Sequence, residues 1–468
     1  MGGVIIFAVK TRVVILVLAL VVLLVAGLGS YAWNMRPELI EVYPAAGAAE
    51  VPVTSQIRMA FSRRMNTEMV ISHLTIEPAI EGEYGWEENT LIFTPDQAWP
   101  GGQEINVHLE AGVRAARWLS FPMPAQSWSF KTSGAYLAYL WPSDGRADIY
   151  ALNPITGEVE QYTHGMGVLE FTVGSDGIMF YFSASNAQGG ADLYQIDRIA
   201  AMNSTDDSYK PRRLLDCQAA QCRLPAVSFD GRSLAYEYLI PTTAGSMGPA
   251  RIWLLSLPGL EALPVGEATH ETVQPVWSQT GWLTFYDRTS YSYEVINLQN
   301  QERVQLFNQT GRTGTWSPDG EYYLAAEMTY HPATGYAETG TSHLLRFRIQ
   351  TGTPEDISGA DDVEDVDAVY SPGGGAIAFA RKYLDSERWS LGRQIWMMKP
   401  DGSNPRPITN EADYNHYDIA WSLDGLVLAY VRFNQAKLSD PPELWMIGAD
   451  GGNPVQLVIG GYSPLWIP

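Results

Sequence analysis

The sequence is poor in cysteine and in positive charge. Its 468 residues include two cysteines, Cys217 and Cys222, without further cysteine or histidine residues at the spacing of zinc ligands, which argues against a zinc site. Lys and Arg number 30 against 52 Asp and Glu, so the formal net charge is −22. Such a deficit of positive charge argues against an electrostatic grip on nucleic acid or on an anionic lipid surface.

The cysteine pair leaves two uses open. If this part of the chain faces an oxidising compartment, Cys217 and Cys222 can close a small loop as a disulfide. Otherwise they are two free thiols. Neither use is catalytic.

Familiar catalytic signatures are also missing. The sequence has no Gly-x-Ser-x-Gly, no His-Glu-x-x-His and no Gly-x-x-x-x-Gly-Lys-Ser pattern, which mark serine hydrolases, zinc peptidases and P-loop proteins. We therefore predict no catalytic residues and no cofactor.

One long hydrophobic run is present near the N-terminus. Residues 13–28 carry no charged or strongly polar side chain, and residues 29–33 extend the run to about the length that crosses a bilayer. Lys10 and Arg12 precede it, and the positive-inside bias places residues 1–12 in the cytoplasm. We predict a transmembrane anchor over residues 13–33 with everything after it extracytoplasmic. The alternative is a cleaved secretory signal, although Gly27-Leu28-Gly29 matches Ala-x-Ala poorly.

Composition indicates a large all-β protein beyond the anchor. There are 25 Tyr, 15 Trp, 43 Gly and 29 Pro residues, and this combination favours strands joined by tight turns. The chain is also too long for one ordinary hydrophobic core, so more than one domain is expected.

Short alternating hydrophobic runs over residues 36–132 indicate a β-sandwich. Expected strands include residues 39–42, 57–61, 90–93, 105–109 and 128–130. The segment also resembles bacterial Ig-like domains, in which Val42-Tyr43-Pro44, Met59-Ala60-Phe61-Ser62 and Leu91-Ile92-Phe93-Thr94-Pro95 match in order and spacing. The resemblance implies a spacer more than a ligand site, since fold alone does not assign function.

A repeat organises residues 133–468. Its fullest copies contain Trp316-Ser317-Pro318-Asp319-Gly320 and Trp421-Ser422-Leu423-Asp424-Gly425. Each copy continues into a second strand with a hydrophobic core and then a third strand. The seven second-strand cores are Leu137-Ala138-Tyr139, Phe180-Tyr181-Phe182, Leu234-Ala235-Tyr236, Leu283-Thr284-Phe285, Leu324-Ala325-Ala326, Ile377-Ala378-Phe379 and Leu428-Ala429-Tyr430.

The Asp-Gly of the repeat indicates a two-residue hairpin turn. Gly accepts a positive φ, and Asp can accept a hydrogen bond from a nearby backbone N–H. The large aromatic residues are expected between neighbouring sheets.

The chain ends predict closure of the repeat array. The first copy begins at its second strand, whereas the last residues, Pro464-Leu465-Trp466-Ile467-Pro468, repeat the first-strand pattern and then stop. One sheet is therefore expected to combine both ends, which removes exposed sheet edges. The predicted fold is all-β: a transmembrane helix, an Ig-like β-sandwich and a seven-bladed β-propeller with strand-exchange closure.

The repeat resembles a known family. Residues 394–409, with Ala420-Trp421-Ser422 and Leu428-Ala429-Tyr430, are similar to the repeat of periplasmic TolB-type propellers and, more weakly, to propellers of dipeptidyl-peptidase-like enzymes. TolB itself is described with six blades, so seven copies argue against direct functional equivalence.

In such a fold the connections between blades emerge on one face, and their contents suggest two kinds of site. A hard cation such as calcium needs clustered oxygen ligands, although the spacing here lacks the order of an EF-hand loop. A solvated acidic loop is the alternative. The candidate metal ligands are Asp361, Asp365, Asp367, Asp413 and Asp418.

The same face is the favoured candidate for protein or peptide docking, because binding residues gather on loops held by a rigid scaffold. The opposite face and the Ig-like domain are the competing surfaces. The candidate docking residues are His164, His270, Glu271, Arg312, Tyr414, His416 and Tyr417.

The predicted function is a membrane-anchored extracytoplasmic binding or scaffold protein with a protein partner that is extracellular or belongs to the cell envelope. The alternative is a glycan- or peptide-processing enzyme with its site in the propeller channel. A sialidase-like version is disfavoured, because its Asp-box separates Asp from Gly whereas this chain has them adjacent.

Overall fold

The computed structural model describes most of the chain as two compact units, one ending at Ser133 and the other running from Gly134 to Pro468. The described residues are 36–49, 51–53, 55–96, 98–117, 120–203, 209–332, 338–359, 362–467 and a few positions between 18 and 31. Within these residues, no helix has the length and apolar character to cross a bilayer. Residues 1–12 and most of the predicted anchor lie outside the described part.

The N-terminal unit contains two antiparallel sheets. Alternation in the sequence buries one face of each sheet, and Ile105, Phe93, Phe130 and Trp99 are almost fully buried between them. The first sheet has the order β1-β2-β5-β4 and the second β3-β6-β7. The strands are β1 (Leu39–Tyr43), β2 (Ile57–Phe61), β3 (Leu74–Glu77), β4 (Gly82–Glu87), β5 (Thr90–Pro95), β6 (Glu104–Leu109) and β7 (Gln126–Lys131).

The same unit has elements that the hydrophobic pattern did not reveal. These are β3, β4 and the short helix α2 (Thr67–Ser72). The helix begins after Asn66, whose side chain accepts a hydrogen bond of 3.1 Å from the Met69 N–H. β4 was missed because its sequence, Gly-Glu-Tyr-Gly-Trp-Glu, has little apolar alternation and mostly exposed side chains.

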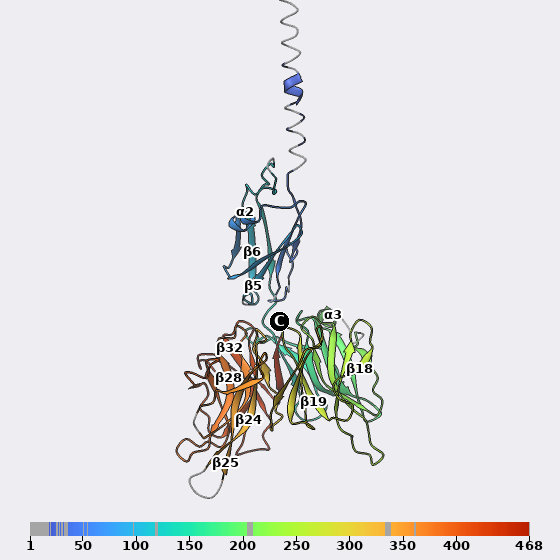
Figure 1. The fold of residues 1–468 in the computed structure, drawn as a ribbon, viewed down its shortest axis with the longest axis vertical. Helices are drawn as coiled ribbons and strands as arrows, with labels where there is room; N and C mark the ends of the chain where they lie inside the picture. Colours follow the sequence, from blue (N-terminus) through green and yellow to red (C-terminus); the bar gives the residue numbers. More distant parts are fainter. Residues whose placement is uncertain are drawn as a thin grey trace, which may run out of the picture. The chain divides into compact units, whose positions relative to one another are not determined.

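The C-terminal unit consists of β-sheets (Figure 1). Among the described residues, the strand pairing gives seven successive antiparallel runs of four strands. The runs are β35-β8-β9-β10, β11–β14, β15–β18, β19–β22, β23–β26, β27–β30 and β31–β34. We call the leading strand of each run its first strand. The first strands are β35 (Tyr462–Trp466), β11 (Val168–Val173), β15 (Gln221–Val227), β19 (Thr272–Trp277), β23 (Thr315–Trp316), β27 (Val363–Tyr370) and β31 (Tyr414–Trp421).

The remaining strands of the unit supply the outer parts of the runs. Second strands are β8 (Leu137–Trp141), β12 (Met179–Ser185), β16 (Ser233–Leu239), β20 (Trp282–Asp287), β24 (Tyr322–Pro332), β28 (Ile377–Tyr383) and β32 (Val427–Asn434). Third strands are β9 (Asp148–Leu152), β13 (Ala191–Asp197), β17 (Arg251–Ser256), β21 (Ser292–Asn297), β25 (Glu338–Arg348), β29 (Gln394–Met398) and β33 (Glu443–Gly448). Fourth strands are β10 (Val159–Gln161), β14 (Arg212–Leu215), β18 (Ala262–Pro264), β22 (Arg303–Phe307), β26 (Thr353–Asp356), β30 (Arg406–Pro407) and β34 (Val455–Ile459), and the helix α3 (Arg198–Asn203) follows β13.

The last strand of the chain joins the first sheet of the unit. In β35, Tyr462 lies opposite Leu140 and Trp466 opposite Leu137 of β8. The Ile467 N–H then donates a hydrogen bond of 2.9 Å to the Tyr136 carbonyl. This is the pairing that the two chain ends predicted.

The Asp-Gly turns hold the ends of the first strands, but they are longer than predicted. Five residues, not two, separate β31 from β32, because the Ser422 hydroxyl closes the turn by accepting from the Val427 N–H at 2.9 Å. Asp424 accepts from the Leu426 N–H at 3.0 Å, and Gly425 has a φ of 69°. Asp424 thus accepts a backbone hydrogen bond and Gly425 has a positive φ, as predicted, but in a turn that is longer than predicted.

Tryptophans at the ends of the first strands connect neighbouring runs. Trp277 donates to the Ala226 carbonyl at 3.0 Å, Trp421 to Val369 at 3.2 Å and Trp466 to Ala420 at 3.3 Å. In each case the indole N–H reaches the first strand of the preceding run. At these three positions Trp therefore makes a hydrogen bond that a purely apolar residue could not make.

Candidate functional site

Opposite the turns lies the surface that we call the loop face. It is formed by the starts of the first strands and by the connections between second and third strands. Polar side chains at the starts of third strands form hydrogen bonds with the connections of this face and hold them in place. Asp148, at the start of β9, accepts hydrogen bonds from the Thr163 hydroxyl at 2.8 Å, the Gly165 N–H at 2.7 Å and the Met166 N–H at 3.0 Å. Gln394, at the equivalent position of β29, accepts from the Glu411 N–H at 2.7 Å.

Irregular backbone recurs along the first strands at this face. Five of them contain a β-bulge with a non-glycine residue at positive φ, between 47° and 58°. A bulge redirects a side chain out of the regular alternation, and positive φ in such residues marks strain that the surrounding structure enforces. The five residues are Leu224, Gln274, Asp367, Asp418 and Ser463.

Two of these bulges bring carboxylates from neighbouring runs close to each other. Part of the Asp418 side chain reaches solvent, but removal of water by the surrounding strands, followed by the charge of Asp367, raises the pKa of Asp418 to about 6. The Ser463 N–H donates to Asp418 and partly offsets this shift. Burial also raises the pKa of Asp367, while the positive charges of Arg312 and Arg393 oppose that rise. Of the predicted residues, Asp367, Asp418 and Arg312 therefore share one site.

Other predicted docking residues lie on the loop face without joining that site. His164 and the metal-ligand candidate Asp413 are exposed. His270 contacts the Asp287 carboxylate at 2.5 Å, and Glu271 forms an ion pair with Arg288 at 2.6 Å. These two pairs tie the connection before β19 to the end of β20.

Two predicted surface residues are inside the fold. Asp365 is fully buried and forms two hydrogen bonds with Arg381, at 2.7 and 2.6 Å. His416 is also fully buried, and its ring nitrogens face the Arg393 carbonyl at 2.7 Å and Glu411 at 3.3 Å. Both belong to first strands instead of loops, so alternation turns their side chains inward.

The predicted metal ligands do not form a metal site within the described residues, where no three His, Cys, Asp or Glu side chains are placed to hold an ion. Asp361 lies outside the described residues. Asp365 is already neutralised by Arg381.

Cys217 and Cys222 are joined by a disulfide. Both are buried, and the Cys217 N–H donates to Asp192 at 2.9 Å. The bridge closes the connection that leads into β15.

Aromatic and cationic side chains gather on the loop face beside β28, β29, β31 and β32. The guanidinium of Arg388 lies 3.8 Å from the Tyr383 ring centre, and the Lys382 ammonium 4.8 Å from that of Trp389. Trp389 is 54% exposed. The predicted residues Tyr414 and Tyr417 extend this cluster through Arg432 and Phe433, since Arg432 lies 4.1 Å over Tyr414 and the Tyr417 and Phe433 rings are 5.7 Å apart. We call this cluster the aromatic patch.

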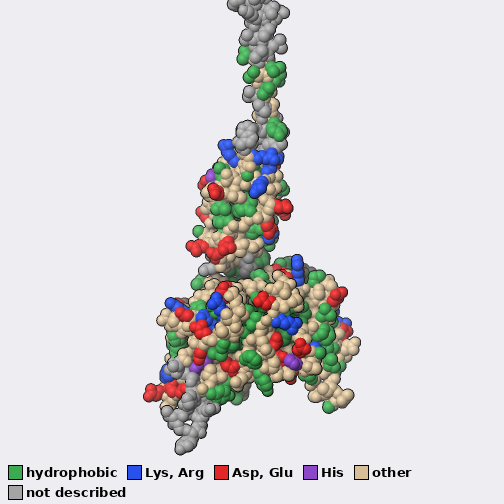
Figure 2. Space-filling model, viewed as in Figure 1, with side chains coloured by type: hydrophobic (Ala, Val, Ile, Leu, Met, Phe, Trp, Pro, Cys, Tyr) green, Lys and Arg blue, Asp and Glu red, His purple; other side chains and the backbone are tan. Residues whose placement is uncertain are grey.

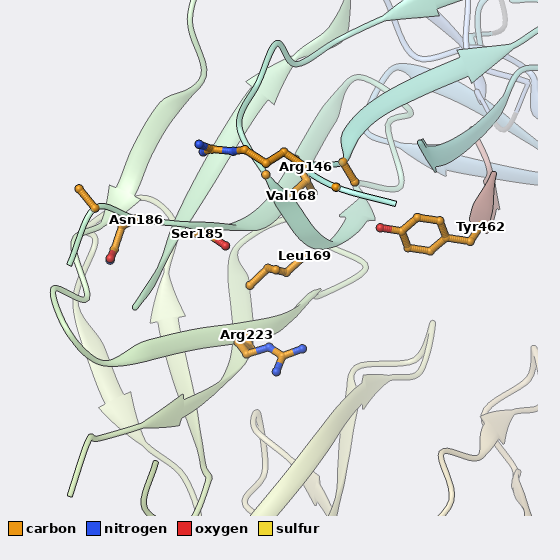
Figure 3. A pocket seen from close by; sticks show the side chains of 11 residues that line it. Arg146, Val168, Leu169, Ser185, Asn186, Arg223 and Tyr462 are labelled. Carbon is orange, nitrogen blue, oxygen red and sulfur yellow. The ribbon is translucent and has the colours of Figure 1, made fainter. Parts of the chain in front are cut away.

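A cavity of about 560 Å³ opens on another part of the loop face (Figure 3). It is lined by residues of the connection between β8 and β9, the start of β11, the turn after β12, β15 and β35. Figure 3 shows Arg146, Ser185, Arg223 and Tyr462 around it. No sequence pattern predicts this cavity, because its walls come from segments that are far apart in the chain.

Comparisons with known proteins match the N-terminal unit to a family and list structural neighbours of the chain. Residues 34–132 match the bacterial Ig-like domain family, which confirms that prediction. A comparison with curated proteins finds no match. Similar solved structures include a putative TolB from Agrobacterium tumefaciens, with 16% identity, a TM-score of 0.39 and coverage of 71% of this chain and 92% of that one.

Two further structures have the same character. TolB from Acinetobacter baumannii has 10% identity, a TM-score of 0.43 and coverage of 92% of this chain and 99% of that one. The β-propeller domain of the Trilobed protease from Pyrococcus furiosus has 13% identity, a TM-score of 0.45 and coverage of 62% and 84%. TolB and other propeller proteins are thus among the structural neighbours, as the repeat predicted.

Proposed function

We propose that this chain is a binding or scaffold protein that presents the loop face of a seven-bladed, closed β-propeller to a protein or peptide partner. The N-terminal hydrophobic run would tether it to the membrane, and the Ig-like domain would act as a spacer outside the cytoplasm. The observation that carries the proposal is the aromatic patch on a face whose loops are fixed by buried hydrogen bonds.

Closure of the propeller is supported from both sides of the sheet that contains β35. One hydrophobic cluster combines Ile467 with Phe180 of the following run. Another combines Trp466 and Leu137 with Val431 and Leu444 of the last run. The first and last runs would therefore be neighbours in a ring, which leaves no open edge to aggregate.

The composition of the aromatic patch favours a protein partner. Tyr, Trp and Arg are enriched where protein interfaces lose most water, and few such residues usually carry most of the binding energy. Elsewhere, on the face shown in Figure 2, acidic and basic side chains are interspersed over this unit. A rigid display of partly exposed Trp389, Tyr414 and Tyr417 thus supports docking without large rearrangement.

Site-specific photocrosslinking in intact membranes tests the proposal. A photoreactive residue at Trp389 should capture a defined partner, whereas one at Ile155, which is 85% exposed near the outer strand β10, should not. Tyr417→Ala should reduce capture from position 389, and Val159→Ala near the control position should not. Equal capture from both positions would contradict docking on this face.

Protease accessibility tests the proposed orientation. With the chain in closed vesicles of known sidedness, protease on the extracytoplasmic side should cut the propeller. Extraction at alkaline pH should leave the uncleaved chain in the membrane fraction, whereas release would contradict the anchor.

A second candidate, a glycan- or peptide-processing enzyme, rests on Asp367 and Asp418. Two nearby carboxyl groups with different environments can divide acid and base roles. Asp418→Asn abolishing turnover of a glycan or peptide, with the fold intact, would favour this function over docking.

A further inference from the structure

The cavity of Figure 3 differs in charge from the rest of the molecule. The chain has 52 acidic and 30 basic residues, yet the residues that line this cavity include two arginines and no Asp or Glu. Its volume, about 560 Å³, is within the range of about 300–1,000 Å³ typical of ligand sites.

Arg146 is available for a ligand. Its guanidinium donates to the Met166 carbonyl at 3.3 Å, and no described carboxylate lies within the 4.0 Å of an ion pair. The side chain runs along Gly167, where a Cβ would come within 3.1 Å of the Arg146 Nε. Gly167 also has a φ of 67°, which favours glycine, and its lack of a side chain lets Arg146 lie close to the cavity wall.

Arg223 has donor capacity left after its internal contacts. Its Nε and Nη2 both contact one Glu170 oxygen, the Nε at 3.0 Å. The other Glu170 oxygen accepts from the Ser183 hydroxyl at 2.5 Å and the Leu224 N–H at 3.4 Å. Both oxygens of the Glu170 carboxylate therefore already accept hydrogen bonds. The Arg223 Nη1, in contrast, makes no hydrogen bond to the described residues.

Two hydroxyl groups at the cavity can also donate hydrogen bonds to a ligand. Figure 3 shows the Tyr462 hydroxyl pointing from β35 toward the strand that carries Val168 and Leu169. Burial, followed by the charge of Glu170, raises the pKa of Tyr462, so the hydroxyl keeps its proton at neutral pH. Ser185 adds a second, exposed hydroxyl.

The cavity walls are fixed before any ligand binds. The Val168 N–H donates to the Ala147 carbonyl at 2.8 Å, and the Ser185 N–H donates to the Gly167 carbonyl at 3.1 Å. Asn186 closes its own turn by accepting from the Gly190 N–H at 2.9 Å. Fixed donors lose little entropy on binding.

We infer that this cavity binds carboxylate groups of an acidic peptide segment, with Arg146 and Arg223 as the anion-binding residues. Guanidinium groups form strong charge-assisted hydrogen bonds with carboxylates. The peptide assignment rests on the proposed function, because the cavity and the aromatic patch open on the same loop face. Val168, Leu169 and Ala187 provide apolar contacts between the two arginines.

Calorimetric titration of the full chain in detergent tests this inference. The probes are the acetylated and amidated tripeptide Glu-Ala-Glu and its neutral analogue Gln-Ala-Gln. We expect the acidic tripeptide to bind more tightly, with an affinity that falls as salt rises. Arg146→Gln should weaken its binding roughly tenfold or more.

Matched variants separate binding from folding. Arg232→Gln removes another exposed arginine, in the turn after β15 and outside the cavity, and should leave the affinity unchanged. The double variant Arg223→Gln with Glu170→Gln removes the second anion-binding residue without leaving the Glu170 carboxylate unpaired. This variant should also weaken binding. Equal affinity for the two tripeptides, or unchanged affinity in Arg146→Gln, would overturn the inference.

A glycan ligand and the docking proposal are distinguished by two further readouts. Binding of a uronic acid disaccharide without binding of Glu-Ala-Glu would overturn the peptide assignment. If the tripeptides fail while crosslinking from position 389 persists, this inference fails and the proposed function stands. If crosslinking fails while Arg146-dependent peptide binding persists, the docking patch is wrong and the cavity assignment stands.

Discussion

Asp365 and Arg381 form an ion pair whose side chains are 0% and 2% exposed. Burial raises the pKa of Asp365, and the hydrogen bond and charge of Arg381 oppose that rise. Removing the carboxylate would leave a guanidinium buried without its partner, which costs about 3–5 kcal/mol. Asp365→Ala should therefore lower the free energy of unfolding by that amount in urea titrations. Asp440→Ala, at an exposed position, should change it by less than about 0.5 kcal/mol, and equal effects would contradict the role of burial.

Asp418 should make stability depend on pH. Its pKa in the folded chain is about 6 against an ordinary value of 3.8, so between these values the folded state binds more protons than the unfolded state. Stability should then fall as pH rises through this window. Because the side chain is partly exposed, we expect a loss of only about 1 kcal/mol. Asp418→Asn should be more stable than the parent at pH 7, and the difference should disappear below the ordinary pKa of 3.8, where the carboxyl is protonated in both states. A difference independent of pH would contradict this account.

At the scale of elements, the tryptophan bonds between runs can be isolated by a matched pair of variants. Trp421 and Trp316 occupy equivalent first-strand positions and are 9% and 7% exposed. The Trp421 indole donates to Val369, whereas the Trp316 indole N–H has no partner among the described residues. Trp→Phe removes similar ring area at both sites, so Trp421→Phe should cost about 1 kcal/mol more than Trp316→Phe. Equal melting temperatures for the two variants would show that the bond contributes nothing.

Asp148 connects a strand to a wall of the cavity. Alanine at this position would leave the Gly165 and Met166 N–H groups without their acceptor, at a cost of about 1–3 kcal/mol. Hydrogen exchange at residues 163–167 should accelerate, and binding of Glu-Ala-Glu should weaken with it. Asp144→Ala, in the exposed turn before β9, serves as the control. Unchanged exchange in Asp148→Ala would mean that the loop is held by other contacts.

The sequence revealed strands better than it revealed sites. Second-strand cores such as Leu428-Ala429-Tyr430 lie in β32 as expected, because local alternation and a nearby turn are enough to define them. The loop-capping role of Asp148 was missed, since it depends on where a segment fifteen or more residues later returns. The sequence predicts His416 on a loop, because the polar residues around it show no hydrophobic alternation that would mark the start of β31. Arg146 and Arg223 meet only through folding, so no local pattern could predict their cavity.

For the whole molecule, the proposed closure and the distribution of charge would allow one acidic chain to present two different surfaces. Neighbouring runs pack against each other through hydrophobic clusters to which residues of both runs contribute. Loops on one face are then held by several sheets at once, so an arginine-lined cavity and an aromatic patch can occupy separate parts of it. A partner with an acidic segment and an apolar segment would contact both, and the linkage would raise its overall affinity.

Removal of the last strand should test closure directly. A chain ending at Gly461 lacks β35, which exposes the edge of β8 and removes Trp466 and Ile467 from two hydrophobic clusters. We expect a lower melting temperature, faster proteolysis within residues 137–152 and a tendency to aggregate through the open edge. A chain ending at Ile467 retains every described β35 contact and should behave as the parent. If the two truncated chains melt alike, the terminal strand does not hold the ring together, and the rigidity assumed for the loop face would need another source.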